Sequence, residues 1–491
     1  MPRSQALLAT LLPLALVLGA MGTTSPTEVP AVLESPDAGA VLEASADAGT
    51  ADAGTELLGL VPPAPVPSRE KAPPIAQLRS LPRKDDVLAQ AKLSRGRFVL
   101  PSGKGGATLT VDPPLQAQIT RIMQDYQVPY GAAVVLEPST GRVLALAEHS
   151  QTDPSMRGLT TRAVFPAASI FKIVTGSALL EAGVAPSEEA CFHGGKRGLS
   201  ERLLEDSSRD GACHTLSSAM GKSANVVFAK LTRKHLSADA LRRMAARLRF
   251  NRQISFPIPT DVSLASIPED EFGLANTGAG FGDVYLSPLH GAALAAASAT
   301  GVWRDPVLFE PSPEASVAPA EEVLSPEVTR ALTGMLEETV THGTARRVFR
   351  ERGFRVEGAV GKTGTLADKN PFRDYSWFVG FAPKDNPRVA VAAVIVNEPL
   401  WRIRATWLGR EAMRLALERF PAPAAPPEAP QEAPLVAQPA PAIEPLSGGE
   451  AVSTASAADV PVPEAASQQE EVPSGEEALP VDTANAAAPV P

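Results

Sequence analysis

Proline is distributed unevenly along this chain, and its distribution limits how much of the sequence can fold. The chain has 48 prolines among 491 residues, concentrated in the two terminal regions. Residues 23–105 are rich in Pro, Ala and Asp, and residues 421–491 are rich in Pro, Ala and Glu. Such segments bury too little apolar surface to offset the entropy lost when their backbone is ordered. We therefore expect a disordered linker over 23–105, one folded domain over 106–420 and a disordered acidic tail over 421–491.

The first 22 residues have the features of an export signal. Arg3 precedes an apolar run at 6–20, and small residues surround Met21 where a signal peptidase would cut. The run is short and Pro13 interrupts it, which argues against a robust membrane span. An uncleaved anchor stays open as the alternative. We expect an exported protein in the periplasm or cell envelope, with inner-membrane association through residues 1–22 left open.

The formal net charge of −10 hides a basic folded region. Residues 421–491 hold eleven Asp or Glu and no Lys or Arg, and residues 23–68 hold seven acids and no base. The rest of the chain is therefore net positive, which suits either an anionic polymer as partner or screening by the acidic ends. We expect no nucleic-acid partner, because the chain carries an export signal and only 5% aromatic residues.

Strand patterns occur at both ends of the expected domain, with helical patterns between them. The early strand patterns lie at 107–111, 131–136 and 143–147, and the late ones at 356–362, 376–381 and 389–396. The helical patterns lie at 114–126, 167–248, 289–300, 326–340 and 406–420. Short connections favour antiparallel pairing. Strands at both ends with helices between them suggest one mixed sheet region plus a helical lobe.

Ser169 and Lys172 form the first pattern that suggests chemistry. They are three residues apart in an apolar helical pattern, so both side chains would lie on one helix face. Lysine can activate a serine hydroxyl when burial and nearby positive charge lower its pKa. The alternative is a small residue near the start of a core helix. The same spacing also occurs at Ser68 and Lys71 in the linker, which shows that the pattern alone is weak.

Ser223 and Asn225 form the second pattern, two residues apart before an apolar helical pattern. In a loop they would reach into a cleft together, where the serine can relay a proton and the amide can both donate and accept. The alternative is a serine that caps a helix beside an unrelated polar residue.

The third pattern, Lys362-Thr363-Gly364-Thr365, follows a strand pattern. A lysine at a strand edge can hold a carboxylate, and glycine lets a substrate backbone approach closely enough to add as a strand. The N–H of Thr365 is a candidate oxyanion donor, and Lys362 would help to keep Lys172 neutral. The alternative is a surface turn.

In this order, Ser-x-x-Lys, Ser-x-Asn and Lys-Thr-Gly resemble the signature of penicillin-binding proteins and serine β-lactamases. The chain resembles the penicillin-binding protein transpeptidase domain, within the serine β-lactamase and D,D-peptidase superfamily, over about 114–420. This resemblance implies an α+β fold with αβα layers, in which helices flank an antiparallel sheet and a helical lobe is inserted between the N- and C-terminal strands. Further stretches similar to that family lie at 131–147, 280–288, 341–345 and 377–380.

The resemblance implies a D,D-transpeptidase or D,D-carboxypeptidase that acts on D-Ala-D-Ala stem peptides of peptidoglycan through a serine acyl-enzyme. Ser169 would attack and Lys172 would take its proton. Ser223 would pass a proton to the leaving D-Ala, and Asn225 would hold the donor backbone. The terminal carboxylate would lie against the Lys-Thr-Gly-Thr strand, formed by Lys362, Thr363, Gly364 and Thr365.

The resemblance also implies that β-lactam antibiotics acylate Ser169 and that no metal or organic cofactor is needed. Interaction with other cell-wall synthesis proteins stays open. We find no glycosyltransferase pattern, so glycan polymerisation is not expected. One alternative is a class D-like serine β-lactamase, a family that usually has an apolar residue in place of Asn225. The other is a non-catalytic β-lactam sensor or wall-binding module.

Cys191 and Cys213 are the only cysteines in the chain. Two cysteines in an exported protein favour a disulfide, which is our prediction. Two free thiols are an alternative. A zinc site that also uses His193 and His214 is a third, although the spacing fits no common zinc pattern.

Overall fold

The computed structural model describes residues 75, 78–82, 84–101, 106–195, 198–311 and 320–422. The predicted export signal, most of the predicted linker and the predicted tail beyond residue 422 lie outside these described residues. The chain divides into one unit that ends at Ala416 and another that begins at Leu417, and the description below concerns the first. None of the helices built from described residues is long and apolar enough to cross a membrane.

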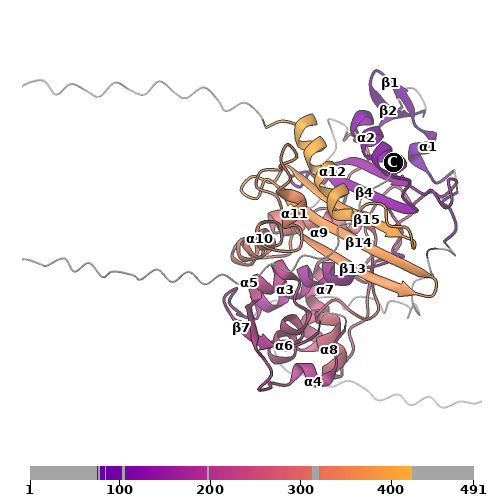
Figure 1. The fold of residues 1–491 in the computed structure, drawn as a ribbon. Coiled ribbons are helices and arrows are strands. Elements are labelled where there is room, and N and C mark those ends of the chain that lie inside the picture. Colours follow the sequence, from indigo (N-terminus) through magenta and orange to yellow (C-terminus); the bar gives the residue numbers. More distant parts are fainter. Residues whose placement is uncertain are drawn as a thin grey trace, which may run out of the picture. The chain divides into compact units, whose positions relative to one another are not determined.

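A five-stranded antiparallel sheet forms the centre of the fold, with the strand order β13-β14-β15-β4-β5 (Figure 1). Its strands are β4 (Tyr130–Leu136), β5 (Val143–His149), β13 (Val360–Lys369), β14 (Phe372–Ala382) and β15 (Val389–Asn397). Strands from the two ends of the domain meet where β15 pairs with β4. The predicted α+β fold, with helices inserted between N- and C-terminal strands, is confirmed.

Helices cover both faces of this sheet: α2 (Pro113–Asp125), α9 (Pro288–Thr300) and α12 (Ala405–Arg419). A Cβ atom built on Gly291 of α9 would touch Val379, whereas one built on Gly409 of α12 would touch Phe378. Neighbouring residues of a strand point to opposite faces, so α9 and α12 lie on opposite sides of β14. The result is the predicted arrangement of helices, sheet and helices in three layers.

The helical lobe lies between β5 and β13 in the sequence and is drawn in magenta below the sheet in Figure 1. Its elements are the 3-10 helix η2 (Ala168–Phe171), α3 (Lys172–Glu181), β7 (Glu189–Phe192), α4 (Glu201–Leu204), β8 (Ala212–Thr215), α5 (Leu216–Lys222), α6 (Asn225–His235), α7 (Ala238–Arg247) and α8 (Glu271–Gly278). The other elements between these strands are β6 (Phe165–Pro166), β9 (Leu264–Ala265), β10 (Val284–Leu286), β11 (Val302–Trp303), β12 (Glu321–Glu322), α10 (Pro326–Thr341) and α11 (Arg346–Phe349).

The long helices begin where their sequences place a capping residue before proline. Asp112, Ser287 and Ser325 each accept a backbone N–H bond from the first turn of α2, α9 and α10, and proline follows each of them. Proline suits this position because its missing N–H would have no partner there. The apolar faces of these helices then pack on the sheet and on the lobe.

The predicted linker boundary at residue 105 is wrong, because the structure contains ordered elements before it. They are α1 (Val87–Gln90), β1 (Lys92–Ser94) and β2 (Arg97–Leu100), and β2 pairs with β3 (Ala107–Thr108). Further upstream, Ile75, Leu78 and Leu81 are buried in the core. These three apolar residues, spaced three apart, dock on a surface formed by the rest of the domain, so their segment does not need a continuous apolar run of its own.

Two predicted strands have different limits in the structure. Strand β13 begins at Val360 and continues to Lys369, so the Lys-Thr-Gly pattern lies inside the strand and not in a surface turn after it. Every residue of β13 has a partner in β14, so the part of the strand beyond the predicted end at residue 362 is also paired. The early strand predicted at 107–111 is limited to β3.

Candidate active site

Ser169 and Lys172 lie side by side at the junction between a 3-10 helix and an α-helix. Ser169 lies within η2, whereas the sequence predicted the first turn of an α-helix, and Lys172 is the first residue of α3. The Lys172 Nζ atom lies 2.8 Å from the Ser169 Oγ atom. The spacing of three residues therefore places both side chains on one face, as expected for either type of helix.

Lys172 is fully buried, and its ammonium group has three hydrogen-bond acceptors. Besides Ser169, Nζ donates to Asn225 Oδ1 at 2.7 Å and to the Ala279 carbonyl at 2.6 Å. Burial lowers the pKa of Lys172 well below its ordinary value, and the positive charge of Lys362 lowers it further. A lysine with this environment can accept a proton from the adjacent serine hydroxyl. The sequence does not predict the contact with Ala279, because this residue follows the end of α8, far from Lys172 in the sequence.

Ser223 and Asn225 come from the break between two helices. Ser223 ends α5 in the left-handed region, with φ 56° and ψ 42°, and Asn225 is the first residue of α6. This break turns both side chains toward the other two motifs. Asn225 reaches Lys172, and Ser223 reaches Lys362. Ser223 is therefore at a helix end, but its hydroxyl contacts another catalytic motif.

Lys362 is the second fully buried lysine of the cleft. Its Nζ atom donates to Ser223 Oγ at 2.9 Å and to the Thr363 carbonyl at 2.8 Å. Burial lowers the pKa of Lys362 to about 7. The structure thus joins all three sequence patterns in one cluster, in which Lys172 contacts Ser169 and Asn225 while Lys362 contacts Ser223.

The edge of the sheet lies beside this cluster. Strand β13 is the first in the strand order, so one of its edges has no neighbour in this five-stranded sheet. A Cβ atom on Gly364 would lie 3.2 Å from side-chain carbons of both Ile170 and Trp377, so glycine lets β13 pack against η2. Thr363 is half-buried and Thr365 is exposed, so residues beside this edge remain accessible to a ligand.

The backbone before Ser169 is held in an unusual conformation. Ala168 has a φ of 49°, in the left-handed region that side-chain-bearing residues seldom adopt. Gly280, with φ +91°, lies against it, and a Cβ atom there would lie 2.5 Å from the Ala168 carbonyl oxygen. Only glycine fits at position 280, so the loop after α8 closes directly on the backbone of the serine. Strain of this kind is often found at functional sites.

Thr344 is a site residue to which the sequence reasoning gave no role. Its hydroxyl lies 2.5 Å from the hydroxyl of Thr363, and its N–H donates to the Gly221 carbonyl at 3.0 Å. It therefore links β13 to the end of α5, just before Ser223. Thr344 lies in the stretch 341–345 that is similar to the family, but its proximity to Thr363 depends on the tertiary fold.

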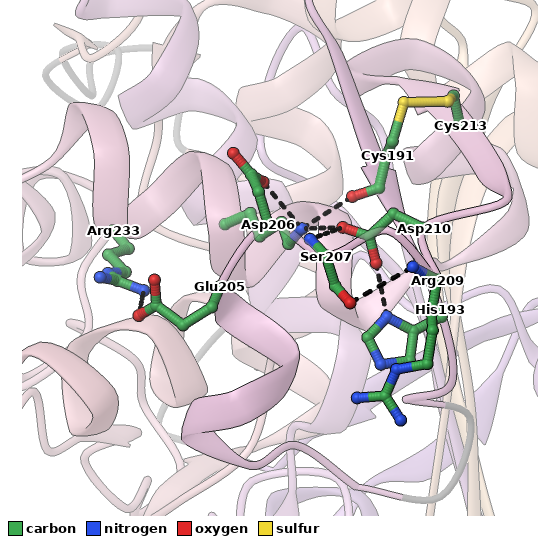
Figure 2. Close-up of polar contacts among 10 residues, drawn as sticks. Cys191, His193, Glu205, Asp206, Ser207, Arg209, Asp210, Cys213 and Arg233 are labelled. Carbon is green, nitrogen blue, oxygen red and sulfur yellow. Dashed lines mark hydrogen bonds and ion pairs between the residues drawn. A yellow bond between two sulfur atoms is a disulfide. The ribbon is translucent and has the colours of Figure 1, made fainter.

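A disulfide joins Cys191 on β7 to Cys213 on β8, where the two residues are direct partners in the strand pair (Figure 2). Strand β8 continues into α5 and then into Ser223. The covalent bond therefore restrains the segment that leads into the cleft. With both sulfurs bonded to each other, the zinc alternative has no thiolate ligands. Among the described residues, no group of three or more His, Cys, Asp or Glu side chains could hold a metal ion.

Lys230 reinforces the same region from α6. Its Nζ atom donates to the Cys191 carbonyl at 2.9 Å and to the carboxylates of Asp210 and Asp206 at 2.8 and 3.1 Å. Figure 2 shows Asp210 also directed at His193, with 2.5 Å between its Oδ1 atom and Nδ1 of the ring. These contacts hold the pKa of Asp210 at about 2. Because Asn225 begins the helix that carries Lys230, this network connects the disulfide to the cleft.

Comparison with known proteins agrees with this geometry. Residues 131–408 match the Transpeptidase family, described as the penicillin binding protein transpeptidase domain. The peptidoglycan D,D-transpeptidase PbpA of Mycobacterium tuberculosis is 29% identical over 367 residues, which cover 65% of this chain and 73% of that protein. Stage V sporulation protein D of Bacillus subtilis is 26% identical, over 59% of this chain and 49% of that protein.

Two solved structures have the same fold. The D,D-transpeptidase domain of a peptidoglycan glycosyltransferase from Eggerthella lenta aligns with a TM-score of 0.53 and 27% identity, over 64% of this chain and 83% of that one. The imipenem acyl-enzyme complex of penicillin-binding protein A from M. tuberculosis aligns with a TM-score of 0.52 and 25% identity, over 63% and 79%. The family match spans more than half of the sequence, and this chain belongs to the penicillin-binding protein transpeptidase family.

Proposed function

We propose that this protein is a serine D,D-transpeptidase that cross-links peptidoglycan by acyl transfer from D-Ala-D-Ala stem peptides. The observation that carries the proposal is the position of Ser169, 2.8 Å from a buried lysine whose pKa is lowered. A serine nucleophile needs an adjacent base, and the lowered pKa of Lys172 favours the neutral form that can act as one. Family membership and the similarity to an acyl-enzyme complex support the same chemistry.

In the acylation step, the Ser169 oxygen attacks the carbonyl carbon of the penultimate D-Ala while Lys172 takes the hydroxyl proton. The carbonyl oxygen becomes an oxyanion, which the N–H groups of Ser169 and Thr365 would stabilise. Asn225, fixed by its bond to Lys172, would orient the donor peptide. The terminal carboxylate would lie along β13 against Lys362 and Thr363.

Collapse of this intermediate breaks the bond to the last D-Ala and leaves an ester on Ser169. The departing nitrogen takes a proton from Ser223, which is reprotonated by Lys362, the lysine that donates to its hydroxyl. An amine of a second stem peptide then attacks the ester and gives up a proton through Ser223 to Lys362, while Lys172 returns its proton to the Ser169 oxygen. The cross-link forms and Ser169 is freed. If water attacks instead, the same enzyme acts as a D,D-carboxypeptidase. β-Lactam antibiotics would acylate Ser169 by the first step.

The proposed reaction also implies where the protein acts. Peptidoglycan lies outside the cytoplasm, so we propose that the protein acts in the periplasm or cell envelope, with residues 1–22 as its export signal or anchor. Its substrates would be the stem peptides of the cell wall.

The test is to incubate purified protein with a fluorescent penicillin and, separately, with a peptide that ends in D-Ala-D-Ala. We expect covalent labelling in the unchanged protein and in Ser68→Ala, none in Ser169→Ala, and release of D-Ala from the peptide. Labelling that persists in Ser169→Ala would refute the assignment of the nucleophile.

The lifetime of the acyl-enzyme distinguishes the alternatives. A transpeptidase should hold the penicilloyl ester for many minutes, whereas a class D-like β-lactamase would hydrolyse it within seconds. A β-lactam sensor or wall-binding module would be labelled but would release no D-Ala. Adding an amine acceptor separates transpeptidation from carboxypeptidation, because only transpeptidation yields the cross-linked product.

A further inference from the structure

Five arginines lie close together in the sequence just before β13. Arg346 and Arg347 lie on α11, and Arg350, Arg352 and Arg355 follow it. All five side chains are exposed. We refer to these five residues as the arginine patch. Arginine is fully charged at any physiological pH, so the patch carries a dense positive charge.

This charge is not neutralised by neighbouring acids. Within the part of the chain that the structure describes, none of the five arginines forms an ion pair. Glu351 instead pairs with Arg410, which is fully buried beneath the patch. The only other acid between residues 346 and 357 is Glu357. The guanidinium groups of the patch are thus available to an external anion.

The patch also has a defined shape. A surface cavity of about 610 Å³ is lined by Arg346, Arg347 and Arg350, together with Val348 and Glu351. Three arginines that line one cavity offer donors for more than one carboxylate, because each guanidinium presents paired donors that match the two carboxylate oxygens.

The backbone beneath the patch is anchored to the central sheet. Phe349 is buried and packs on Phe378 of β14, with 5.1 Å between the ring centroids. Arg410 of α12 donates to the Val348 carbonyl at 2.8 Å. Helix α11 therefore presents its arginines from a fixed base, which lowers the entropy cost of binding.

The patch is linked to the Lys-Thr-Gly strand through Thr344. Thr344, two residues before Arg346, contacts the Thr363 hydroxyl at 2.5 Å. Helix α11 packs through Phe349 on the α12 side of the sheet, whereas Lys362, the partner of Val379, faces the α9 side. A polymer bound at the Lys-Thr-Gly strand would therefore reach the patch by passing over the edge of β13.

We propose that the arginine patch binds the side-chain and backbone carboxylates of peptidoglycan stem peptides that lie outside the D-Ala-D-Ala end. This inference rests on the proposed function, because it assigns the same polymer to a second contact surface. The patch would hold a neighbouring part of the wall polymer while Ser169 reacts with one peptide. It would affect the capture of polymer but not the acylation step itself.

The test compares two triple variants of the full chain that lose equal charge. One removes the arginines that line the cavity, Arg346→Gln, Arg347→Gln and Arg350→Gln. The control removes exposed arginines on three other helices, Arg121→Gln, Arg243→Gln and Arg330→Gln. The probe is soluble glycan strands with stem peptides that end in D-Ala-D-Ala. We expect about tenfold weaker binding for the cavity variant, from three exposed ion pairs of modest strength, and little change for the control.

Strands whose stem peptides are amidated at every carboxylate except that of the terminal D-Ala should bind the unchanged protein more weakly by a similar factor. A charge-preserving variant, Arg346→Lys, Arg347→Lys and Arg350→Lys, should bind with intermediate strength, because lysine lacks the paired donors. Equal binding of free-carboxylate strands by the unchanged protein and the cavity variant would overturn the proposal. Tighter patch-dependent binding to polyphosphate, or to vesicles with anionic lipids, would overturn it in favour of a phosphate ligand.

A small fluorescent penicillin separates this proposal from the proposed function. The penicillin does not extend to α11, so all variants should be acylated at the rate of the unchanged protein. Failure of the unchanged protein to become labelled would refute the acyl-enzyme function. A labelled cavity variant with undiminished strand binding would refute only the role of the patch.

Discussion

The positive charge of Lys362 lowers the pKa of Lys172, although the two lysines come from different layers of the fold. Both side chains are fully buried, and burial is the larger cause of the shift at Lys172. Each lysine also contacts a serine: Lys172 contacts Ser169, and Lys362 contacts Ser223. Two lysines with lowered pKa values in one cleft are a strong physical indication of acid–base chemistry.

Replacing the proposed base should remove reactivity much more than stability. In Lys172→Met we expect penicillin acylation to fall by about 10³-fold or more, within the range of losses seen for general bases. Loss of its hydrogen bonds costs stability, but removal of a buried lysine offsets part of that cost. The net change in unfolding free energy should stay within about 2 kcal/mol. Stopped-flow acylation and thermal unfolding would check both; Lys234→Met, at an exposed position, is the control.

Binding of a carboxylate-bearing penicillin should weaken as the pH rises through about 7. The pKa of Lys362 is lowered to about 7, so below this pH the lysine is charged and can attract the carboxylate, and above it the attraction is lost. The second-order acylation rate of the free enzyme should show this limb. The methyl ester of the same penicillin should react more slowly and without the limb. A limb of equal size with the ester would contradict the assignment.

The backbone conformation of Ser223 allows its hydroxyl to be tested apart from its effect on folding. Its φ of 56° favours glycine over alanine by about 1 kcal/mol. We expect Ser223→Gly and Ser223→Ala to slow D-Ala release to a similar extent, because both lack the hydroxyl. Chemical denaturation should show the glycine variant to be the more stable of the two. Different activities that follow the stability difference would show that Ser223 acts only through the fold.

Reduction of the disulfide should slow acylation without unfolding the central sheet. The cysteines are 22 residues apart, and closing a loop of this size contributes roughly 3 kcal/mol in the chain-entropy model. The reduced lobe should position Ser223 and Asn225 less well, so the acylation rate falls while the circular dichroism of the sheet persists. Non-reducing peptide mapping should find the linked Cys191–Cys213 peptides. Unchanged acylation after complete reduction would show that the lobe does not need the bond.

Much of the site could be predicted because its motifs are local. A spacing of three residues places Ser169 beside Lys172 in either type of helix, and a break before an apolar helix exposes Ser223 and Asn225. The order of strand and helix patterns was also sufficient to predict a sheet region built from both ends of the domain and a helical lobe between them, whereas the three-layered arrangement came from the resemblance to the family.

The contacts that could not be predicted are those between distant segments. The Ala279 carbonyl that accepts from Lys172 and the Thr344 hydroxyl beside Thr363 are set by how α8, α10 and β13 pack. The ordered structure around Ile75 and Leu81 was not predicted for a related reason. Ile75, Leu78 and Leu81 recur every three residues, but the run is short and lies between prolines, and its burial depends on a surface formed by the rest of the domain.

Because β4 pairs with β15, the central sheet can form only after the C-terminal strands have been synthesised. The sheet needs strands from both ends of the domain, and β13 reaches the serine only as part of that sheet. A ribosome has already made Ser169, Lys172 and Ser223 long before it makes Lys362. A chain that ends before β13 therefore carries Ser169, Lys172 and Ser223 without Lys362 and without the sheet edge that lies beside them.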